Sequence, residues 1–288
     1  MKKNRKQRPA VRIPTSIRFV VWLSQRISSA LATKVALYLF FRPQRFKTPV
    51  REHQMRDAAE QIKFYASSIQ KEIQVYRLQG KKQKVLLIHG WSGRGTQLFF
   101  FAGELQKENC EVITFDMPAH GQSPGNKTNV LELTYCIHDL NQKFGPFDAA
   151  IAHSMGGFAL LRAIKDGLPL QSAAIIGSGD SIEGVFYRFS QQLHFSEKIT
   201  ERMITTVEKQ FGTKLEIYSS SMSIKEIDIP LLIVHDKEDK EAPCECSIAL
   251  HDLARNSQLK LTSGLGHHRI LRDPKTVQHI VQFLFQHP

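Results

Sequence analysis

Short apolar runs of strand length alternate along most of the chain with stretches whose apolar residues recur every three or four positions. Strands are predicted at residues 73–76, 84–89, 111–115, 147–153, 172–176, 230–235 and 258–262. Helices are predicted at residues 96–108, 130–144, 155–165, 243–254 and 274–285. This spacing is typical of right-handed crossover units, so we expect an α/β fold with a doubly wound, mostly parallel sheet.

The alternation stops between about residues 181 and 227. This stretch has helical periodicity and no strand pattern. Because it is inserted near the carboxyl ends of the predicted strands, we expect a helical cap that shapes a substrate pocket. The alternative is that these helices only pack on the sheet.

Residues 19–41 are mostly apolar, but Gln25, Arg26 and Lys34 interrupt them. Each interior cation would cost about 2.5–3.5 kcal/mol at the centre of a bilayer, which argues against a membrane-spanning helix. The polar residues fall on one side of a helix, which either packs on its own domain or lies on an anionic membrane surface. A further helical stretch is predicted around residues 54–65.

The domain organisation follows from these patterns. We expect a basic flexible arm at residues 1–18 and an N-terminal helical extension at residues 19–71. The α/β domain is then expected at residues 72–288, with its helical cap at about 181–227.

The net charge of +12 comes from the N-terminal part of the chain. Residues 1–56 hold 14 of the 39 Lys and Arg residues and one acidic residue, Glu52. The remainder is close to neutral and gives no electrostatic footprint for nucleic acid, so no nucleic-acid partner is expected. The four cysteines include one C-x-C pair, Cys244 and Cys246, but no second pair that would complete a metal site. We therefore expect reduced thiols and a cytoplasmic location. Contact with the inner face of a membrane is left open.

Ser154 stands between the apolar run 149–153 and a helical pattern that opens at Met155. Small residues surround it: Ala152 two positions before, then Gly156 and Gly157 after. A strand that turns sharply into a helix leaves room only for small side chains and exposes a serine at its apex. This is the pattern of a nucleophile elbow, usually G-x-S-x-G, with alanine here at the first position.

Four motifs follow predicted strands in a fixed order: His89-Gly90-Trp91, the elbow at Ser154, then Asp239, then Gly266-His267. In this order and context they resemble the α/β-hydrolase superfamily over residues 72–288. The carboxyl ends of parallel strands meet at one edge of the sheet, so these motifs are expected to converge there.

The resemblance implies Ser154 as nucleophile and His267 as the base that accepts its proton. A serine hydroxyl is a weak nucleophile at neutral pH, and imidazole can take the proton and return it to the leaving group. His267 is preferred because it directly follows a glycine, and His268 is the alternative.

A carboxylate behind the imidazole fixes its tautomer, and the resemblance implies Asp239 for this role. Asp236 and Asp180 are the alternatives. The oxyanion and substrate-binding donors implied by the family are the backbone N–H groups of Trp91 and Met155.

Other histidines and acids near these motifs are expected to brace loops rather than to react. His89 and His153 lie directly beside the oxyanion loop and the nucleophile, and Asp116 and His120 belong to a D-x-P-x-x-G-like loop.

These features predict a serine hydrolase that cleaves a carboxylic ester or thioester of a small molecule through an acyl-enzyme. The mechanism requires no metal or organic cofactor. An acyltransferase or lipid-acting hydrolase at a membrane surface would use the same triad, and a non-catalytic binding protein would share only the fold. The fold alone does not name the substrate.

Overall fold

The computed structural model describes residues 13–286 and divides them into two compact units. The helical unit contains residues 13–40 and Val185–Thr213. The sheet unit contains Phe41–Gly184 and residues 214–286.

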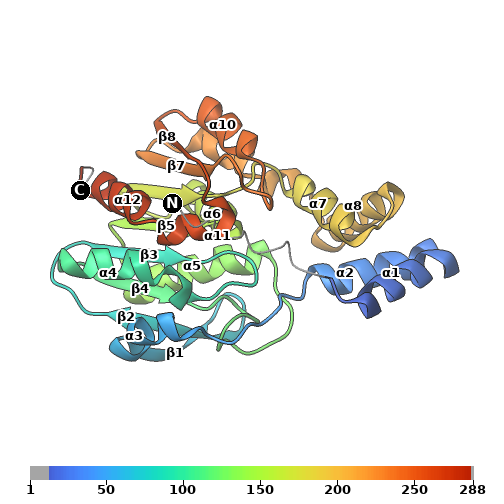
Figure 1. The fold of residues 1–288 in the computed structure, drawn as a ribbon, viewed down its shortest axis with the longest axis horizontal. Coiled ribbons are helices and arrows are strands. Elements are labelled where there is room, and N and C mark those ends of the chain that lie inside the picture. Colours follow the sequence, from blue (N-terminus) through green and yellow to red (C-terminus); the bar gives the residue numbers. More distant parts are fainter. Residues whose placement is uncertain (1–12, 287–288) are drawn as a thin grey trace, which may run out of the picture. The chain divides into compact units, whose positions relative to one another are not determined.

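The sheet unit is built on one eight-stranded sheet with the strand order β1-β2-β4-β3-β5-β6-β7-β8 (Figure 1). β1 and β2 pair antiparallel, as do β2 and β4, and all other neighbours are parallel. The strands are β1 Glu60–Ala66, β2 Lys71–Leu78, β3 Lys84–Ile88, β4 Glu111–Phe115, β5 Ala149–His153, β6 Ser172–Ile176, β7 Leu231–Asp236 and β8 Ser257–Thr262. The expected mostly parallel, doubly wound sheet is confirmed.

Helices cover both faces of this sheet, because its central strands are buried on both sides and need apolar cover. Side chains of α5, α6 and α10 join the core on one face, and those of α3, α4 and α12 join the core on the other. The helices are α3 His53–Ala58, α4 Phe99–Lys107, α5 Val130–Phe144, α6 Met155–Lys165, α9 Ser220–Ser223, α10 Cys244–Leu253, α11 Gly266–Arg269 and α12 Pro274–Gln286, with 3-10 turns at Val50–Glu52, Gly95–Leu98, Leu215–Tyr218, Ile224–Glu226 and Ile270–Arg272.

The edge of the sheet differs from the sequence-based expectation. The helix predicted at 54–65 is α3 followed by β1. In β1, the partly buried Ile62 and Phe64 pack against the core while Gln61 and Lys63 are exposed, which is a period of two rather than of 3.6. The sheet therefore begins before residue 72, the boundary suggested by the sequence.

The helical unit consists of α1 Thr15–Ile27, α2 Ser29–Phe40, most of α7 Ile182–Leu193, and α8 Glu197–Phe211. The single helix expected at 19–41 is interrupted at Ser28, whose backbone is extended. The Ser28 hydroxyl accepts the Leu31 N–H at 3.1 Å and so caps the start of α2. The predicted arm at 1–18 lies largely outside the described residues, and its last residues already belong to α1.

Two distant parts of the sequence thus form one unit. The Gln25 side chain donates to the His194 carbonyl at 3.1 Å and accepts the Ser196 N–H at 3.0 Å, which ties α1 to the turn between α7 and α8. The Phe40 ring stacks on Phe186 at 4.1 Å between centroids. The stretch expected as a cap is helical, as predicted, and its covering of a pocket stays a prediction. None of the described helices is long and apolar enough to span a membrane.

Candidate active site

Ser154 occupies a sharp turn between β5 and α6. Its φ of 52° and ψ of −117° lie in a region that side-chain-bearing residues rarely adopt and that typically costs about 1–3 kcal/mol. The Ser154 N–H donates to the Ile176 carbonyl at 2.9 Å, so the turn is fixed to the neighbouring strand β6. Its side chain is half-buried. This is the strained, accessible geometry predicted for a nucleophile elbow.

The small residues around Ser154 are required by close packing. A Cβ added to Gly156 would lie 2.7 Å from the His89 carbonyl oxygen, and one added to Gly157 would lie 2.6 Å from Ser178 Oγ. Ala152 is fully buried, yet its methyl group is accommodated. The elbow therefore tolerates alanine at its first position and demands glycine at its last two.

Asp239 and His267 form a hydrogen-bonded pair in which Asp239 Oδ2 lies 2.6 Å from His267 Nδ1. Asp239 follows β7, and His267 belongs to α11, which follows β8. Asp239 Oδ1 also accepts the backbone N–H groups of Glu241 and Ala242, at 2.8 and 3.0 Å. The carboxylate is thereby fixed on both oxygens, and it directs the proton of His267 to Nδ1.

The Asp239 carboxylate is buried but stays ionised. Burial alone would raise its pKa, but hydrogen bonds from His235 and His267 outweigh this, so the pKa lies well below the ordinary value for aspartate. His235 Nε2 lies 3.3 Å from Asp239 Oδ2, and His235 Nδ1 lies 2.6 Å from Ser247 Oγ. No motif in the sequence marks His235.

The structure brings Ser154 beside this pair without joining them by a hydrogen bond. Gly177 follows Ile176, the partner of Ser154, and a Cβ built on it would lie 3.3 Å from His267 Nδ1 and 3.4 Å from Asp239 Oδ2. The elbow and the acid–base pair therefore share one edge of the sheet. Catalytic hydrogen bonds are often long in structures without substrate.

His153 holds the backbone of the His267 turn. Its ring lies 4.5 Å from that of His267, and its Nε2 donates to the His267 carbonyl at 3.0 Å. Burial, together with the neighbouring His267 and His268, lowers the pKa of His153 well below its ordinary value. It is therefore neutral at physiological pH and has a positioning role, as expected from the sequence.

Among the described residues, neither alternative acid forms a hydrogen bond or ion pair with His267. Asp236 accepts the Thr262 hydroxyl at 2.7 Å and the Leu265 N–H at 3.0 Å, and so anchors the loop that leads to His267. No hydrogen bond joins Asp180 to His267 among the described residues.

A second carboxylate, Glu241, approaches the other side of the imidazole. Its Oε2 lies 3.7 Å from His267 Nε2, and its Oε1 lies 3.0 Å from His268 Nε2. Its side chain is 49% exposed, in contrast to the 1% of Asp239. His268, the alternative base, therefore pairs with Glu241, which no sequence motif marks.

The two predicted oxyanion donors belong to the first residue of α6 and to the loop after β3. The Met155 N–H has no partner within its helix because it belongs to the first turn. Trp91 follows Gly90, whose carbonyl accepts from His89 Nδ1 at 2.7 Å, while His89 Nε2 accepts the Met117 N–H at 2.9 Å. His89 thus braces the loop, and burial lowers its pKa well below the ordinary value.

The rest of this loop is held by buried polar groups. His120 Nε2 accepts the Ser92 N–H at 3.0 Å, and Asp116 accepts the N–H groups of Gly95 and Gln122, both at 2.7 Å. Burial lowers the pKa of His120 to about 4. Both residues brace the loop, in agreement with the sequence-based expectation.

A buried ion pair fixes the same loop to the segment before the sheet. Arg94 donates to both oxygens of Glu52, each at 2.6 Å, and the Thr96 hydroxyl donates to Glu52 at 2.9 Å. Glu52 was visible in the sequence only as the single acid of a basic stretch, and nothing there indicated this partner.

Within the described part of the chain, no group of three or more His, Cys, Asp or Glu side chains is arranged to hold a metal ion. The four cysteines form no disulfide there. Independently of this, the Ser154 hydroxyl and the Asp239–His267 pair offer nucleophilic and acid–base chemistry.

Solved structures of low sequence identity share this fold. An esterase from Pyrococcus furiosus is 18% identical and has a TM-score of 0.65, with 85% of this chain and 98% of that chain covered. A putative lipase from Acinetobacter baumannii is 21% identical with a TM-score of 0.62, covering 84% and 97%. A bromoperoxidase from Bacillus anthracis is 18% identical with a TM-score of 0.59, covering 79% and 99%. At these identities the likeness shows the fold alone.

In sequence, no curated protein matches the chain. A family model does match, and its description is the alpha/beta hydrolase family. The match spans residues 85–277, from β3 to α12, and includes the elbow, the Asp239 turn and the His267 turn. The chain belongs to the alpha/beta hydrolase family.

Proposed function

We propose that the chain is a serine hydrolase that cleaves a carboxylic ester or thioester through an acyl-enzyme. Ser154 is the nucleophile, His267 the general base and acid, and Asp239 the carboxylate that orients His267. The observation that carries this proposal is the 2.6 Å contact between Asp239 and His267, located beside a serine with a strained backbone.

Acylation starts when Ser154 Oγ attacks the carbonyl carbon of the substrate. His267 Nε2 accepts the hydroxyl proton, because the hydrogen bond to Asp239 keeps the resting proton on Nδ1. The developing oxyanion receives hydrogen bonds from the N–H groups of Met155 and Trp91. The carbon–oxygen or carbon–sulfur bond then breaks, and His267 returns the proton to the departing alcohol or thiol.

Deacylation repeats these steps with water. His267 takes a proton from the water molecule, the hydroxide attacks the acyl carbon, and Ser154 Oγ leaves with the proton. The products are the free acid and the regenerated serine. These steps balance without a metal ion or an organic cofactor.

The esterase and lipase among the structural neighbours support ester bonds as the substrate class, as an analogy at the level of the fold. An acyltransferase would form the same acyl-enzyme and pass it to an acceptor other than water. A lipid substrate is the second candidate, because the helical unit exposes a large apolar surface. A binding protein without catalysis is disfavoured by the ordered Asp239–His267 pair.

A fluorophosphonate probe tests the proposal, because it labels only an activated serine. We expect labelling of Ser154, located by peptide mass spectrometry, and loss of labelling in Ser154→Ala. A folded protein without label would contradict the enzyme assignment. A series of p-nitrophenyl esters of rising chain length beside acyl thioesters would then define the acyl group and the leaving group.

A further inference from the structure

The helix α1 exposes several of its large apolar side chains to solvent. Its buried residues are Val21 and Ser24, whereas Phe19, Trp22 and Ile27 are 58%, 51% and 63% exposed. Large apolar side chains of a surface helix normally face the core and polar ones face solvent. The outer face of α1 is therefore suited to an apolar or amphipathic environment.

This pattern is not shared by the whole helical unit. In α8, Ile199, Met203 and Val207 are buried, whereas Glu201 and Lys209 are exposed. α8 thus follows the ordinary amphipathic pattern, so the exposed aromatic side chains of α1 do not reflect a generally loose packing of the unit.

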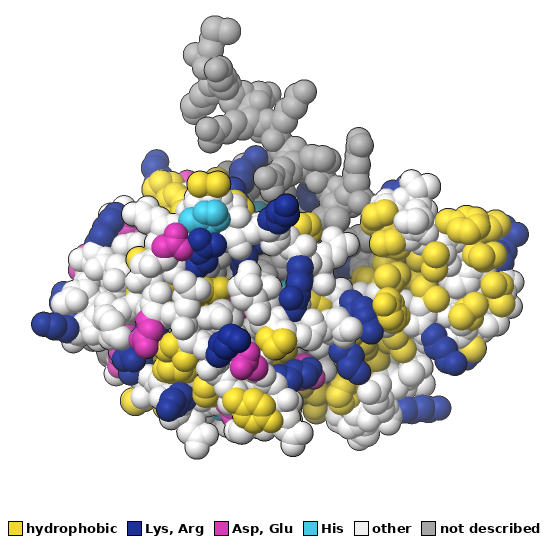
Figure 2. Space-filling view, turned by 90° about the horizontal axis from the view of Figure 1, so that it is seen from below, with side chains coloured by type: hydrophobic (Ala, Val, Ile, Leu, Met, Phe, Trp, Pro, Cys, Tyr) yellow, Lys and Arg dark blue, Asp and Glu magenta, His cyan; other side chains and the backbone are white. Residues whose placement is uncertain are grey.

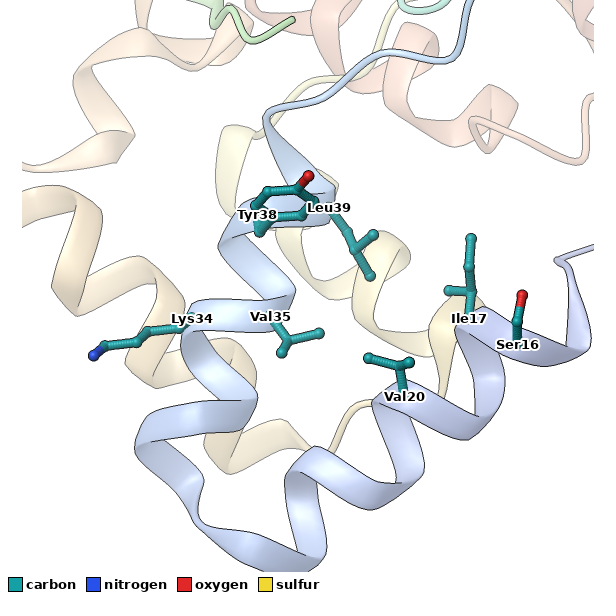
Figure 3. A pocket seen from close by; sticks show the side chains of 7 residues that line it. All are labelled: Ser16, Ile17, Val20, Lys34, Val35, Tyr38 and Leu39. Atoms are coloured by element: carbon teal, nitrogen blue, oxygen red, sulfur yellow. The ribbon is translucent and has the colours of Figure 1, made fainter.

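The apolar surface continues between α1 and α2 as an open groove of about 450 Å³. Val20 and Val35 point toward each other across it, while the Lys34 side chain extends away (Figure 3). The remaining lining residues are Ser16, Ile17, Tyr38 and Leu39. Val20 and Tyr38 are 48% and 57% exposed, so the groove opens to the surface.

The charged side chains of α1 and α2 all have the same sign. α1 and α2 carry Arg18, Arg26 and Lys34, all exposed, and neither helix contains an acidic residue. The Arg26 guanidinium lies 5.0 Å from the centre of the Trp22 ring. Figure 2 shows hydrophobic side chains gathered at the right of the view with Lys and Arg side chains among them.

We infer that the exposed face of α1 and α2 docks the protein on the surface of an anionic lipid bilayer. Exposed aromatic and aliphatic side chains with cations beside them are typical of helices that lie in the interface between headgroups and acyl chains. The cations match anionic headgroups, and the absence of any acid in α1 and α2 removes the repulsion that such a surface would exert. The inference does not depend on the chemistry proposed for Ser154.

Flotation of the full-length protein with vesicles tests this inference. We expect at least tenfold stronger binding to phosphatidylcholine vesicles with about 30% phosphatidylglycerol than to phosphatidylcholine alone, and a loss of that difference at high salt. The chain has two tryptophans, and Trp22 is one of them. Its emission should shift to shorter wavelength on binding, and Trp22→Phe should remove this shift.

A triple variant, Phe19→Ser with Trp22→Ser and Ile27→Ser, removes the apolar part of the face and should weaken binding at least tenfold. The matched control is Tyr65→Ser with Tyr135→Ser, because these side chains of the sheet unit are also exposed, at 61% and 48%. The control should float like the unmodified protein. Circular dichroism and thermal unfolding verify that both variants are folded.

Equal flotation of the triple variant and the unmodified protein would overturn the inference. The inference would also be overturned if the unmodified protein does not bind vesicles but forms a concentration-dependent dimer, and if the triple variant abolishes this dimer. A second copy of the chain would then cover the face. A Ser154→Ala protein should bind vesicles normally, which separates failure of docking from failure of the proposed catalysis.

Discussion

Asp239 Oδ2 lies 2.6 Å from His267 Nδ1, on the side of the imidazole opposite the nitrogen that faces Glu241. This arrangement predicts that Asp239→Asn lowers kcat for ester hydrolysis by roughly 10³- to 10⁴-fold, because the amide no longer favours a proton on Nδ1 or stabilises the imidazolium. Steady-state kinetics with a p-nitrophenyl ester measure the effect, and circular dichroism verifies the fold.

Glu241→Gln is the matched control, because Glu241 also approaches His267 but is half exposed to solvent. Solvent weakens its interaction with the imidazole, so kcat should change by less than about tenfold. If Glu241→Gln were as damaging as Asp239→Asn, the assignment of the triad carboxylate would be wrong.

The sequence predicted most of the parallel sheet because its central strands are short, fully buried apolar runs. β4, β6 and the helices α5 and α6 begin and end where the pattern predicts. The strand β1 was missed for a physical reason. An edge strand with one solvent-exposed face alternates polar and apolar residues, and the neighbouring helix α3 obscured that alternation.

The candidate site could be predicted where a local constraint requires one residue type at one position of the chain. Ser154 needs small neighbours, and an acid and a base must follow particular strands. Glu241 and the Glu52–Arg94 pair escaped prediction because each depends on tertiary contacts that no local pattern encodes. The same holds for Gln25 and His194, which are 169 positions apart in the chain.

Gly156→Ala should damage both stability and activity. The new methyl group would lie 2.7 Å from the His89 carbonyl oxygen, so the elbow must shift. We expect a loss of about 1–3 kcal/mol in the free energy of unfolding and about a hundredfold loss in kcat/KM.

Gly103→Ala in α4 is the control, because nothing lies within 4 Å of its added Cβ. This change should raise the free energy of unfolding by up to about 1 kcal/mol. Equal effects of the two changes would contradict the packing argument.

Glu52→Gln should lower the free energy of unfolding by about 3–5 kcal/mol, because it leaves the buried Arg94 guanidinium without a charged partner. Urea unfolding measures this change in the free energy of unfolding.

Glu60→Gln provides the comparison. Glu60 Oε2 lies 3.9 Å from Arg77 Nη1, and its side chain is 53% exposed, so the loss of this contact should lower the free energy of unfolding by less than about 1 kcal/mol. Similar losses would show that the Glu52 pair contributes no more than a surface contact.

His120 should make stability depend on pH between about 4 and 6.5. Burial lowers its pKa to about 4 in the folded protein, so the unfolded chain binds more protons in this window. The stabilisation is therefore complete above about pH 6.5 and is lost as the pH falls toward 4, by roughly 3 kcal/mol at most.

In His120→Gln, whose amide oxygen can still accept the Ser92 N–H, the free energy of unfolding should fall less steeply over the same range. Buried His153 titrates in both proteins and cancels in the comparison. His89 loses the charge of the neighbouring His120 in the variant, so its pKa is lowered less there, which also makes the variant's curve less steep. Urea unfolding at a series of pH values measures the two curves, and parallel curves would mean that His120 is protonated as readily in the folded chain as in the unfolded one.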